Sequence, residues 1–220
     1  MKRSLGPITP HAGLLALSLC ALSVMGFGAA LEGYSQLQHP VALLGARGMP
    51  HAAAFNLLGF GLPGVLAAWA AVGLRGQLPG DANWAARIGA RLLLLSAVAF
   101  AAQGLLPLDP GDLDGPISQW HATAWTLWWI AAGAGALSIA AGLLRRPGWR
   151  TFAGAALVAS VLIVVPALSP PESWPAGIAQ RIALGAWLGL FVFAGRAPTG
   201  AAHVSRGAAS SPGSSPPARR

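Results

Sequence analysis

The sequence predicts an all-α fold: a polytopic membrane protein built as a bundle of six transmembrane helices with a disordered C-terminal tail. Three observations lead to this prediction. Apolar residues make up 55% of the 220-residue chain, charged residues make up only 9%, and the apolar residues gather in long runs between short polar segments. Soluble domains carry roughly 25% charged residues, so this chain cannot cover a water-facing surface. We therefore expect one membrane domain, residues 1–196.

Six apolar runs have lengths close to that of a membrane span, which takes about 20 residues as a helix. They cover residues 13–31, 52–74, 85–106, 121–144, 149–168 and 178–195. The first run has the charged start of a signal peptide, and Gly28 and Ala30 could form a cleavage site. Its apolar stretch, however, exceeds the roughly 7–15 residues of such a peptide. Residues 197–220 are rich in Ala, Gly, Ser and Pro, so disorder is predicted there.

The second run contains a glycine pattern that has two interpretations. Gly59, Gly61 and Gly64 have the G-x-G-x-x-G spacing of dinucleotide-binding turns, which need a strand before them and a helix after them. Here the pattern lies within an apolar run beside Pro63. We therefore interpret these glycines as positions of close helix contact, with a kink at the proline. No cofactor is predicted.

The fourth run combines small and aromatic residues. Ala132, Ala136 and Ala140 recur every four residues, a spacing that lets helices pack closely in a membrane. The beginning of this run is rich in tryptophan, which is typical of the aromatic belt at the membrane–water interface. We assign four residues to that belt: Trp120, Trp125, Trp128 and Trp129.

The basic residues predict the orientation, because loops rich in Lys and Arg face the cytoplasm. Six spans place twelve basic residues on one face and only Arg47 and Arg181 on the other. Both termini are therefore predicted to be cytoplasmic, in a plasma membrane. The acidic residues, Asp81 excepted, fall on the outer face. The net charge of +8 is scattered over the ends of apolar runs rather than gathered in a stripe, so nucleic acid is not an expected partner, whereas membrane lipids are.

The outer ends of the predicted helices carry most of the polar side chains that topology does not explain. An unpaired polar group in hydrocarbon costs several kcal/mol, so those about one turn inside a helix should face a partner or a wet pocket. We expect Asn56 and Gln103 to turn inward in this way, toward one another or toward such a pocket. The candidate ligand-binding residues are Tyr34, Ser35, His39, Asn56, Gln103, Asp109, His121 and Arg181.

These residues allow more than one interpretation. His39, Asp109 and His121 have the side chains of a metal site or a general base, but they come from separate segments and lack a metal-ligand spacing, so no metal site is predicted. A structural interpretation has the two histidines joining loops to helix ends and Asp109 pairing with Arg181. The single cysteine, Cys20, rules out an intrachain disulfide.

Four functions are therefore considered. The outer residues could bind a small molecule or a lipid headgroup, with Arg181 and Arg47 as donors to a phosphate. The protein could instead be a structural, partner-stabilising membrane subunit, which the small-residue helix faces would suit. A membrane-embedded hydrolase or transferase would use His39, Asp109 and His121. A transporter would normally show an internal repeat and ionisable groups near the bilayer centre, and the sequence shows neither.

Several short motifs resemble those of a bacterial membrane family catalogued as domain of unknown function 998 (DUF998). They are Tyr-Ser-x-x-x-His-Pro-Val at residues 34–41, Leu-Gly at 44–45, Phe-Asn at 55–56, Leu-Pro-Leu-Asp at 106–109, and the later His121 and Arg181. The likeness covers residues 13–196. It implies a six-helix protein of the bacterial inner membrane and brings no reaction. Where the family often has a serine before Leu-Gly, this chain has Ala42, so a hydroxyl nucleophile is not expected there.

Overall fold

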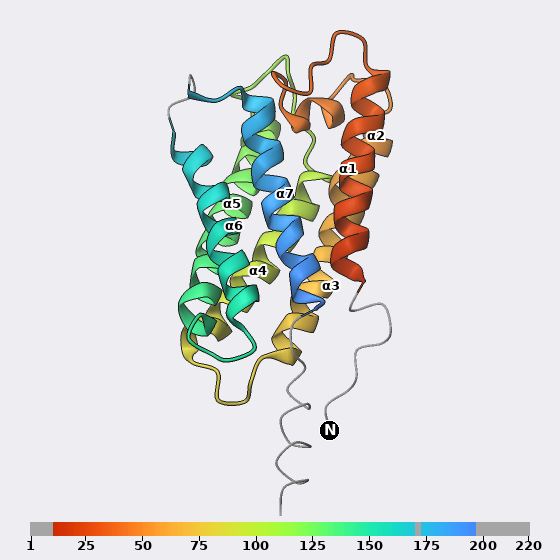
Figure 1. Ribbon diagram of the computed structural model, residues 1–220. Coiled ribbons are helices and arrows are strands. Elements are labelled where there is room, and N and C mark those ends of the chain that lie inside the picture. The colour runs from red at the N-terminus through yellow and green to blue at the C-terminus, as the bar shows by residue number, and fades with distance from the viewer. Residues whose placement is uncertain (1–10, 170–172, 197–220) are drawn as a thin grey trace, which may run out of the picture.

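The structure is a computed structural model and describes residues 11–169 and 173–196. The helical elements in these ranges are α1 (Ala12–Ala30), η1 (Val41–Gly45), α2 (Ala52–Phe55), η2 (Asn56–Gly61), α3 (Leu62–Gln77), α4 (Trp84–Gln103), α5 (Pro116–Leu143), α6 (Arg150–Leu168) and α7 (Ala176–Ala194). Figure 1 shows them as one upright bundle with no strand in the described part. The predicted tail, together with Lys2, Arg3 and Glu172, lies outside the described residues.

Six of the described helices are long and apolar enough to cross a membrane, which confirms the predicted number of spans. The second of these spans, Ala52–Gln77, is continuous but contains three elements, α2, η2 and α3. Its middle element, η2, is a π-helical turn directly before Pro63. A wider turn suits this position, because proline donates no N–H and its ring crowds the preceding turn. Where a kink at Pro63 is predicted, the structure shows a local widening of the helix.

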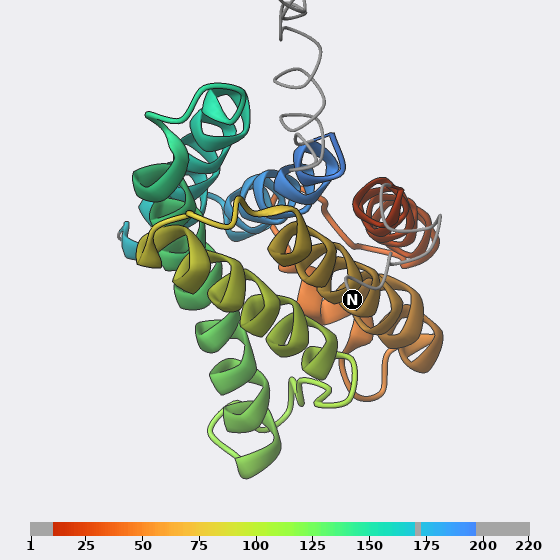
Figure 2. The ribbon, with the colours of Figure 1, turned by 90° about the horizontal axis from the view of Figure 1, so that it is seen from below.

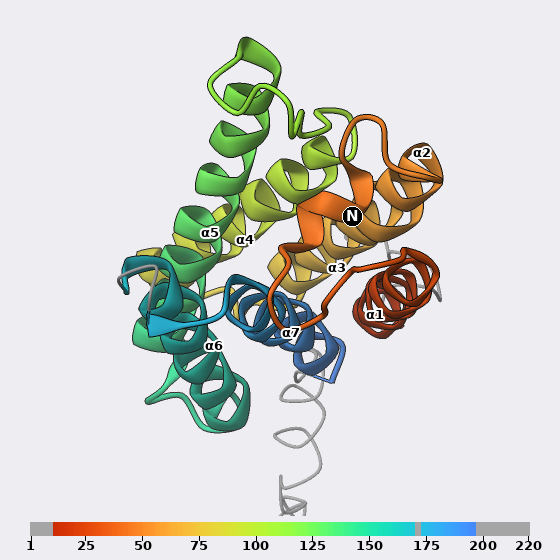
Figure 3. The same ribbon diagram turned by 90° about the horizontal axis from the view of Figure 1, so that it is seen from above.

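Helices that follow one another in the sequence pack side by side from α3 to α7, and α1 packs against both α3 and α7. The views along the bundle show the resulting arrangement, with α1 beside α3 and α7 and with α6 on the opposite side (Figures 2 and 3). The short elements η1 and η2 lie near the end of the bundle where α1 finishes (Figure 1). These contacts bring the first polar loop, residues 31–51, over the beginning of α7.

Small residues allow the closest helix contacts. A Cβ atom added to Gly89 in α4 would lie 2.8 Å from the carbonyl oxygen of Gly135 in α5, and one added to Gly64 in α3 would lie 2.6 Å from the backbone nitrogen of Ala101. Ala132 and Ala136 are fully buried, and Ala140 nearly so. The predicted packing roles of the α5 alanines and of Gly64 are confirmed. Backbones that approach this closely gain dispersion contacts, which association in lipid depends on.

Aromatic side chains fill the interior where α4, α5 and α7 meet. The Phe100 ring lies 4.9 Å from that of Trp187 and 6.0 Å from that of Trp128, and the two tryptophan rings are 5.6 Å apart. Trp187 Nε1 donates a 2.9 Å hydrogen bond to Ser96 Oγ, which satisfies the indole within the membrane. The assignment of Trp128 to the interfacial belt is wrong, because it is fully buried, whereas Trp120 is 62% exposed. Helical periodicity turns Trp128 toward the core and Trp120 away from it.

The two ends of the bundle differ in charge, as the sequence predicted. One end carries the loops over residues 31–51 and 104–115, with Arg47 and Arg181 as its basic residues in the described part. The opposite end carries seven arginines within the described ranges: Arg75, Arg87, Arg91, Arg145, Arg146, Arg150 and Arg196. There Arg146 Nη1 lies 2.9 Å from Asp81 Oδ1, and its hydrogen bond lowers the pKa of Asp81 below the ordinary value.

The contact of Gly89 with α5 gives a test of the helix packing. Gly89→Ala should lower the free energy of unfolding by about 1–3 kcal/mol, because its Cβ atom would displace the α5 backbone. Gly189→Ala in α7 is the matched control: nothing lies within 4 Å of its added Cβ atom, so the change should be neutral or stabilise by about 0.5–1 kcal/mol. Thermal unfolding in detergent measures both. Equal melting temperatures for the two variants would contradict the close α4–α5 approach.

Candidate functional site

Arg181 joins the first outer loop to the second turn of α7. Its Nη2 donates to the hydroxyl of Tyr34 at 2.7 Å, and its Nε donates to Gln36 Oε1 at 3.0 Å. Nη1 donates to the carbonyl oxygens of His39 and Gly177 at 3.2 and 2.8 Å. Nη2 also donates to Gln36 Oε1. We call Arg181 with Tyr34, Gln36 and His39 the arginine clamp.

The clamp uses every donor that a guanidinium has. The group carries five N–H bonds in a fixed plane, and each has an acceptor here. All of these acceptors are neutral, and no carboxylate within the described ranges pairs with Arg181. Burial raises the pKa of Tyr34 despite the opposing hydrogen bond and charge of Arg181, so the phenol is a neutral partner at physiological pH. A phosphate could bind Arg181 only by breaking existing hydrogen bonds.

Further contacts hold the same loop against α7. Gln36 Nε2 donates to the carbonyl oxygen of Val24 in α1 at 3.0 Å. The backbone N–H of Val41 donates to Gln180 Oε1 at 2.8 Å, and that of Ile178 donates to the carbonyl oxygen of Leu37 at 3.2 Å. A Cβ atom on Gly177 would lie 2.6 Å from loop carbonyl oxygens, so only glycine fits this contact. The loop, α1 and α7 therefore form one connected polar layer.

Within the loop, Ser35 and His39 form a turn. The backbone N–H of Ser35 donates to Nδ1 of His39 at 2.9 Å, and the Ser35 hydroxyl accepts from the backbone N–H of Gln38 at 3.3 Å. The His39 ring lies 5.5 Å from the Tyr34 ring. The His39 ring closes a turn within the loop, and its carbonyl oxygen rather than its ring joins the loop to α7 by accepting from Arg181.

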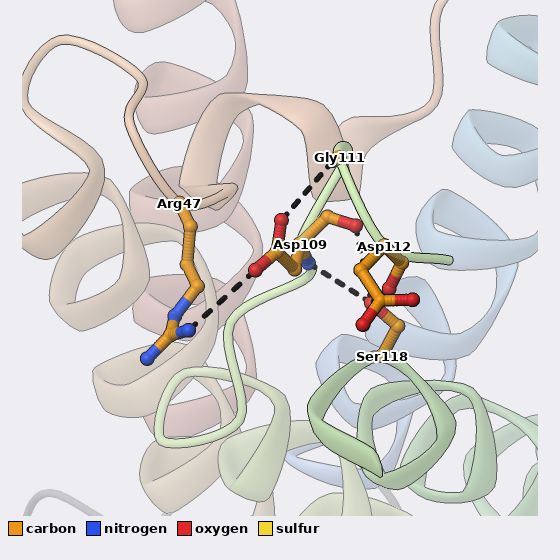
Figure 4. Close-up of polar contacts among 5 residues, drawn as sticks. All are labelled: Arg47, Asp109, Gly111, Asp112 and Ser118. Atoms are coloured by element: carbon orange, nitrogen blue, oxygen red, sulfur yellow. Dashed lines mark hydrogen bonds and ion pairs between the residues drawn. The ribbon is translucent and has the colours of Figure 1, made fainter. Parts of the chain in front are cut away.

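Asp109 belongs to a different group, shown in Figure 4. Its Oδ2 lies 3.5 Å from Arg47 Nη1, and its Oδ1 accepts from the backbone N–H of Gly111 at 3.1 Å. The Ser118 hydroxyl accepts from the Asp109 N–H at 3.1 Å and donates to the carbonyl oxygen of Asp112 at 2.8 Å. The predicted pair of Asp109 with Arg181 is wrong. The chain instead brings Arg47 beside Asp109 through a backbone bond from Arg47 N to the Leu108 carbonyl oxygen at 2.8 Å.

Asn56 and Gln103 both turn inward, as predicted, and of the two expected arrangements the direct pair is not formed. Asn56 Nδ2 donates to the carbonyl oxygen of Gly45 at 2.9 Å, so its partner is the first outer loop. Gln103 is fully buried, and neither of its amide atoms has a partner in the described part of the chain. Trp128 Nε1 is also buried without a hydrogen-bond partner among the described residues. An unsatisfied buried group costs about 1–3 kcal/mol, which marks this outer part of the core as incompletely satisfied.

His121 lies in α5 and joins it to the α4–α5 connection. Its Nδ1 lies 2.7 Å from the carbonyl oxygen of Leu106, so this nitrogen carries the proton. The ring also makes an edge contact with Phe60, with centroids 6.4 Å apart. The predicted role of His121 in joining a loop to a helix end is confirmed.

The eight candidate residues therefore fall into separate groups. Tyr34, Ser35, His39 and Arg181 belong to the first loop and α7, whereas Asp109 pairs with Arg47, and the other three lie below these loops. In residues 11–169 and 173–196 no three His, Cys, Asp or Glu side chains gather as metal ligands would. The hydrolase hypothesis needs His39, Asp109 and His121 in one site. The structure gives each a different partner.

A cavity lies elsewhere, between the middle of α5, the last turns of α6 and the beginning of α7. Its volume is about 470 Å³, within the usual range for small-molecule sites. Four tryptophans contribute to the lining, together with aliphatic residues of α6 and α7, and two lining side chains are polar, Ser169 and Gln180. No charged residue lines it among those described. The tryptophans are Trp125, Trp128, Trp129 and Trp174.

Sequence reasoning did not find this cavity. Trp125, Trp128 and Trp129 share one side of a helix by their spacing, which is a signal for a common environment. The belt interpretation explained the same residues, and nothing in the sequence showed that Gln180 and Ala183 of α7 would face them. Trp128 lines the cavity on its inner side, because its side chain is fully buried in the core.

The model of the family described as protein of unknown function (DUF998) matches residues 15–197. The chain belongs to the DUF998 family. The match includes the arginine clamp, the Asp109 group and the cavity, and it confirms the resemblance seen in the motifs. With six helices suited to crossing a membrane, this DUF998 member is a multi-pass integral membrane protein that contacts lipid. No match was found among curated proteins or solved structures.

The clamp predicts a large effect for a change that keeps the charge. Arg181→Lys should lower the free energy of unfolding by about 1.5–3 kcal/mol, because an ammonium has three donors and cannot reach all the acceptors of the planar guanidinium. Thermal unfolding in detergent and proteolysis of the loop at residues 31–51 measure the effect.

Arg47→Lys is the control for this comparison. Arg47 makes an exposed pair with Asp109, and such pairs contribute about 0–1 kcal/mol. Arg181→Lys should therefore melt at a clearly lower temperature than Arg47→Lys and release the loop to protease. If the two variants are equally stable and equally resistant, the clamp does not hold the loop.

Proposed function

We propose that this protein binds the apolar part of a membrane amphiphile in the tryptophan-lined cavity between α5, α6 and α7. The observation that carries the proposal is the cavity itself: about 470 Å³, lined by four tryptophans and aliphatic side chains, without a charged residue among those described. Aromatic rings provide large, rigid apolar surfaces, and burying apolar surface contributes about 25 cal/mol per Å².

The position of the cavity supports a ligand that comes from the bilayer. Its lining residues in α6 and α7, such as Ile163 and Ala183, belong to helices that cross the membrane. A water-soluble metabolite would need several polar partners, whereas the lining offers apolar surface and few hydrogen-bonding groups. A lipid chain already lies beside these helices and needs no transfer through water.

The predicted outer residues support this cavity indirectly. Arg181 fixes the first loop to α7, and the loop's Val41 N–H holds the side chain of Gln180, which lines the cavity. In this proposal Tyr34, His39 and Arg181 position the wall of the site. Direct binding of a headgroup by Arg47, whose side chain is 53% exposed, remains compatible with the geometry.

We further propose that the cavity lies on the outer side of a plasma membrane, with both termini in the cytoplasm. The support is the charge difference between the two ends of the bundle: two arginines at the cavity end against seven at the other, counting described residues.

Cysteine labelling tests this orientation in intact cells. In a Cys20→Ala background, Asp112→Cys should react with a membrane-impermeant maleimide, because the loop after α4 would face outward. Arg145→Cys, at the opposite end of α5, is the control and should react only after the cells are opened. The reverse pattern would overturn the proposed orientation while leaving the fold unchanged.

Filling the cavity tests the proposed binding. Ala183 is nearly buried and lines the cavity, so Ala183→Phe should reduce the fraction of protein that retains a lipid by several-fold, measured by native mass spectrometry after detergent exchange. Ala29→Phe on the exposed side of α1 is the matched control and should leave lipid retention unchanged.

Ala179→Leu fills the same cavity from one turn earlier in α7 and provides a second variant should Ala183→Phe fail to fold. Circular dichroism and gel filtration establish that each variant is folded. If both filled variants retain as much lipid as the control, the cavity is not the binding site and the proposal fails.

A further inference from the structure

Most of the polar groups on the side chains around the cavity are hydrogen-bond donors. Indole nitrogens of tryptophan donate only, and three of the four lining tryptophans, Trp125, Trp129 and Trp174, are partly or largely exposed. The Ser169 hydroxyl already donates to the carbonyl oxygen of Val165 at 2.6 Å, so toward a ligand it can only accept. No charged residue lines the cavity among those described. A ligand that complements this lining carries an uncharged acceptor.

Gln180 is the lining residue whose orientation the structure fixes. Its Oε1 accepts from the backbone N–H of Val41 at 2.8 Å, so the two ends of the amide are distinguished. The Nε2 group is left without a partner among the described residues, and it is not enclosed in the way that the Gln103 amide is. Gln180 lies next to Arg181, whose clamp holds the loop that contains Val41. Gln180 therefore presents a positioned neutral donor at the cavity.

We propose that Gln180 is a specificity-determining residue and that the ligand presents a carbonyl oxygen to its Nε2 group. The inference rests on the proposed binding of an apolar molecule in this cavity and adds the chemistry of the polar end. Carbonyl oxygens accept hydrogen bonds well and stay uncharged, which matches a lining without a cation. Two membrane molecules have this chemistry on an apolar body: a glycerolipid, through its acyl ester, and a prenylated quinone, through its ring.

An anionic group is a poorer match. Arg181 is the nearest basic residue to Gln180 in the sequence, and its five N–H bonds are all occupied by the clamp. A phosphate within the cavity would thus meet neutral donors alone, and burying an unpaired charge is strongly unfavourable. The polar head of a bound glycerolipid would remain outside the cavity, with the ester at the level of Gln180.

The test compares two lipids that differ only in the carbonyl groups. Purified full-length protein in detergent is titrated with dioleoyl phosphatidylcholine and with its dialkyl ether analogue, and native mass spectrometry measures both dissociation constants. The ester lipid should bind about three- to tenfold more tightly than the ether lipid, the effect of one neutral hydrogen bond. A prenylated quinone is added in a third arm as a competitor.

Gln180→Glu changes the donor to an acceptor while keeping Oε1 for the Val41 N–H, so its ester-to-ether preference should fall to about one. Gln38→Glu introduces the same charge in the exposed loop and should keep the wild-type preference. Every variant is measured in the same detergent with the same two lipids. The ratio of the two dissociation constants therefore reports only the contribution of the carbonyl groups. Gln180→Met, which has no donor, replaces Gln180→Glu if that variant does not fold.

The outcomes separate this inference from the proposed function. If the wild type binds both lipids equally and the quinone displaces neither, the carbonyl inference is overturned while the cavity remains a chain-binding site. If the wild type prefers the ester lipid and Gln180→Glu loses this preference, the ligand is a glycerolipid. If the quinone displaces the lipid from the wild type but not from Gln180→Glu, the ligand is a quinone. If no lipid and no quinone binds, the proposed function itself fails.

Discussion

The hydrogen bonds of Arg181 hold together the end of the bundle on which the rest of the site depends. A guanidinium at this level, close to the apolar interior, is stable only when its donors are satisfied. The first outer loop supplies the acceptors from Tyr34, Gln36 and His39, and α7 supplies the Gly177 carbonyl oxygen. In satisfying the arginine, the loop also delivers the Val41 N–H to Gln180. One charged residue thereby positions both the loop and a wall of the cavity.

The bundle below this layer depends on a different constraint, the close approach of backbones. Lipid is as apolar as the side chains, so helices gain little by hiding apolar surface from it and gain mainly by packing closely. Glycines such as Gly64 and Gly89 meet the neighbouring backbone, and alanines continue the contact along α5. Large aromatic rings fill the wider space around α7. The combination leaves a cavity between α5, α6 and α7, and tryptophans line it.

The two groups of polar residues at the outer end differ in their surroundings. The arginine clamp is partly buried and each of its donors has an acceptor, whereas the Arg47–Asp109 pair is exposed and 3.5 Å long. The geometry therefore assigns the clamp a positioning role, whereas the Arg47–Asp109 pair contributes little to stability. The unpartnered amide of Gln103 lies in the same outer region, below the loops.

The sequence by itself determined the class of protein, the number of spans, the difference in charge between the two ends and the family. These features follow from composition, run length and local motifs, which need no knowledge of how helices face one another. It also predicted correctly that Asn56 and Gln103 turn inward, and its structural interpretation placed His121 as the link between a loop and a helix end.

Only the tertiary structure decided which residues meet. Arg181 and Asp109 have opposite charges and were expected to pair, yet the chain places Arg47 beside Asp109 and gives Arg181 neutral partners. The sequence assigns Trp128 to the membrane interface, whereas in the structure it is buried and lines the inner side of the cavity. Both differences have the same physical reason. The rotation of each helix and the identity of the helices beside it depend on contacts between residues far apart in the chain, and local sequence patterns do not reveal those contacts.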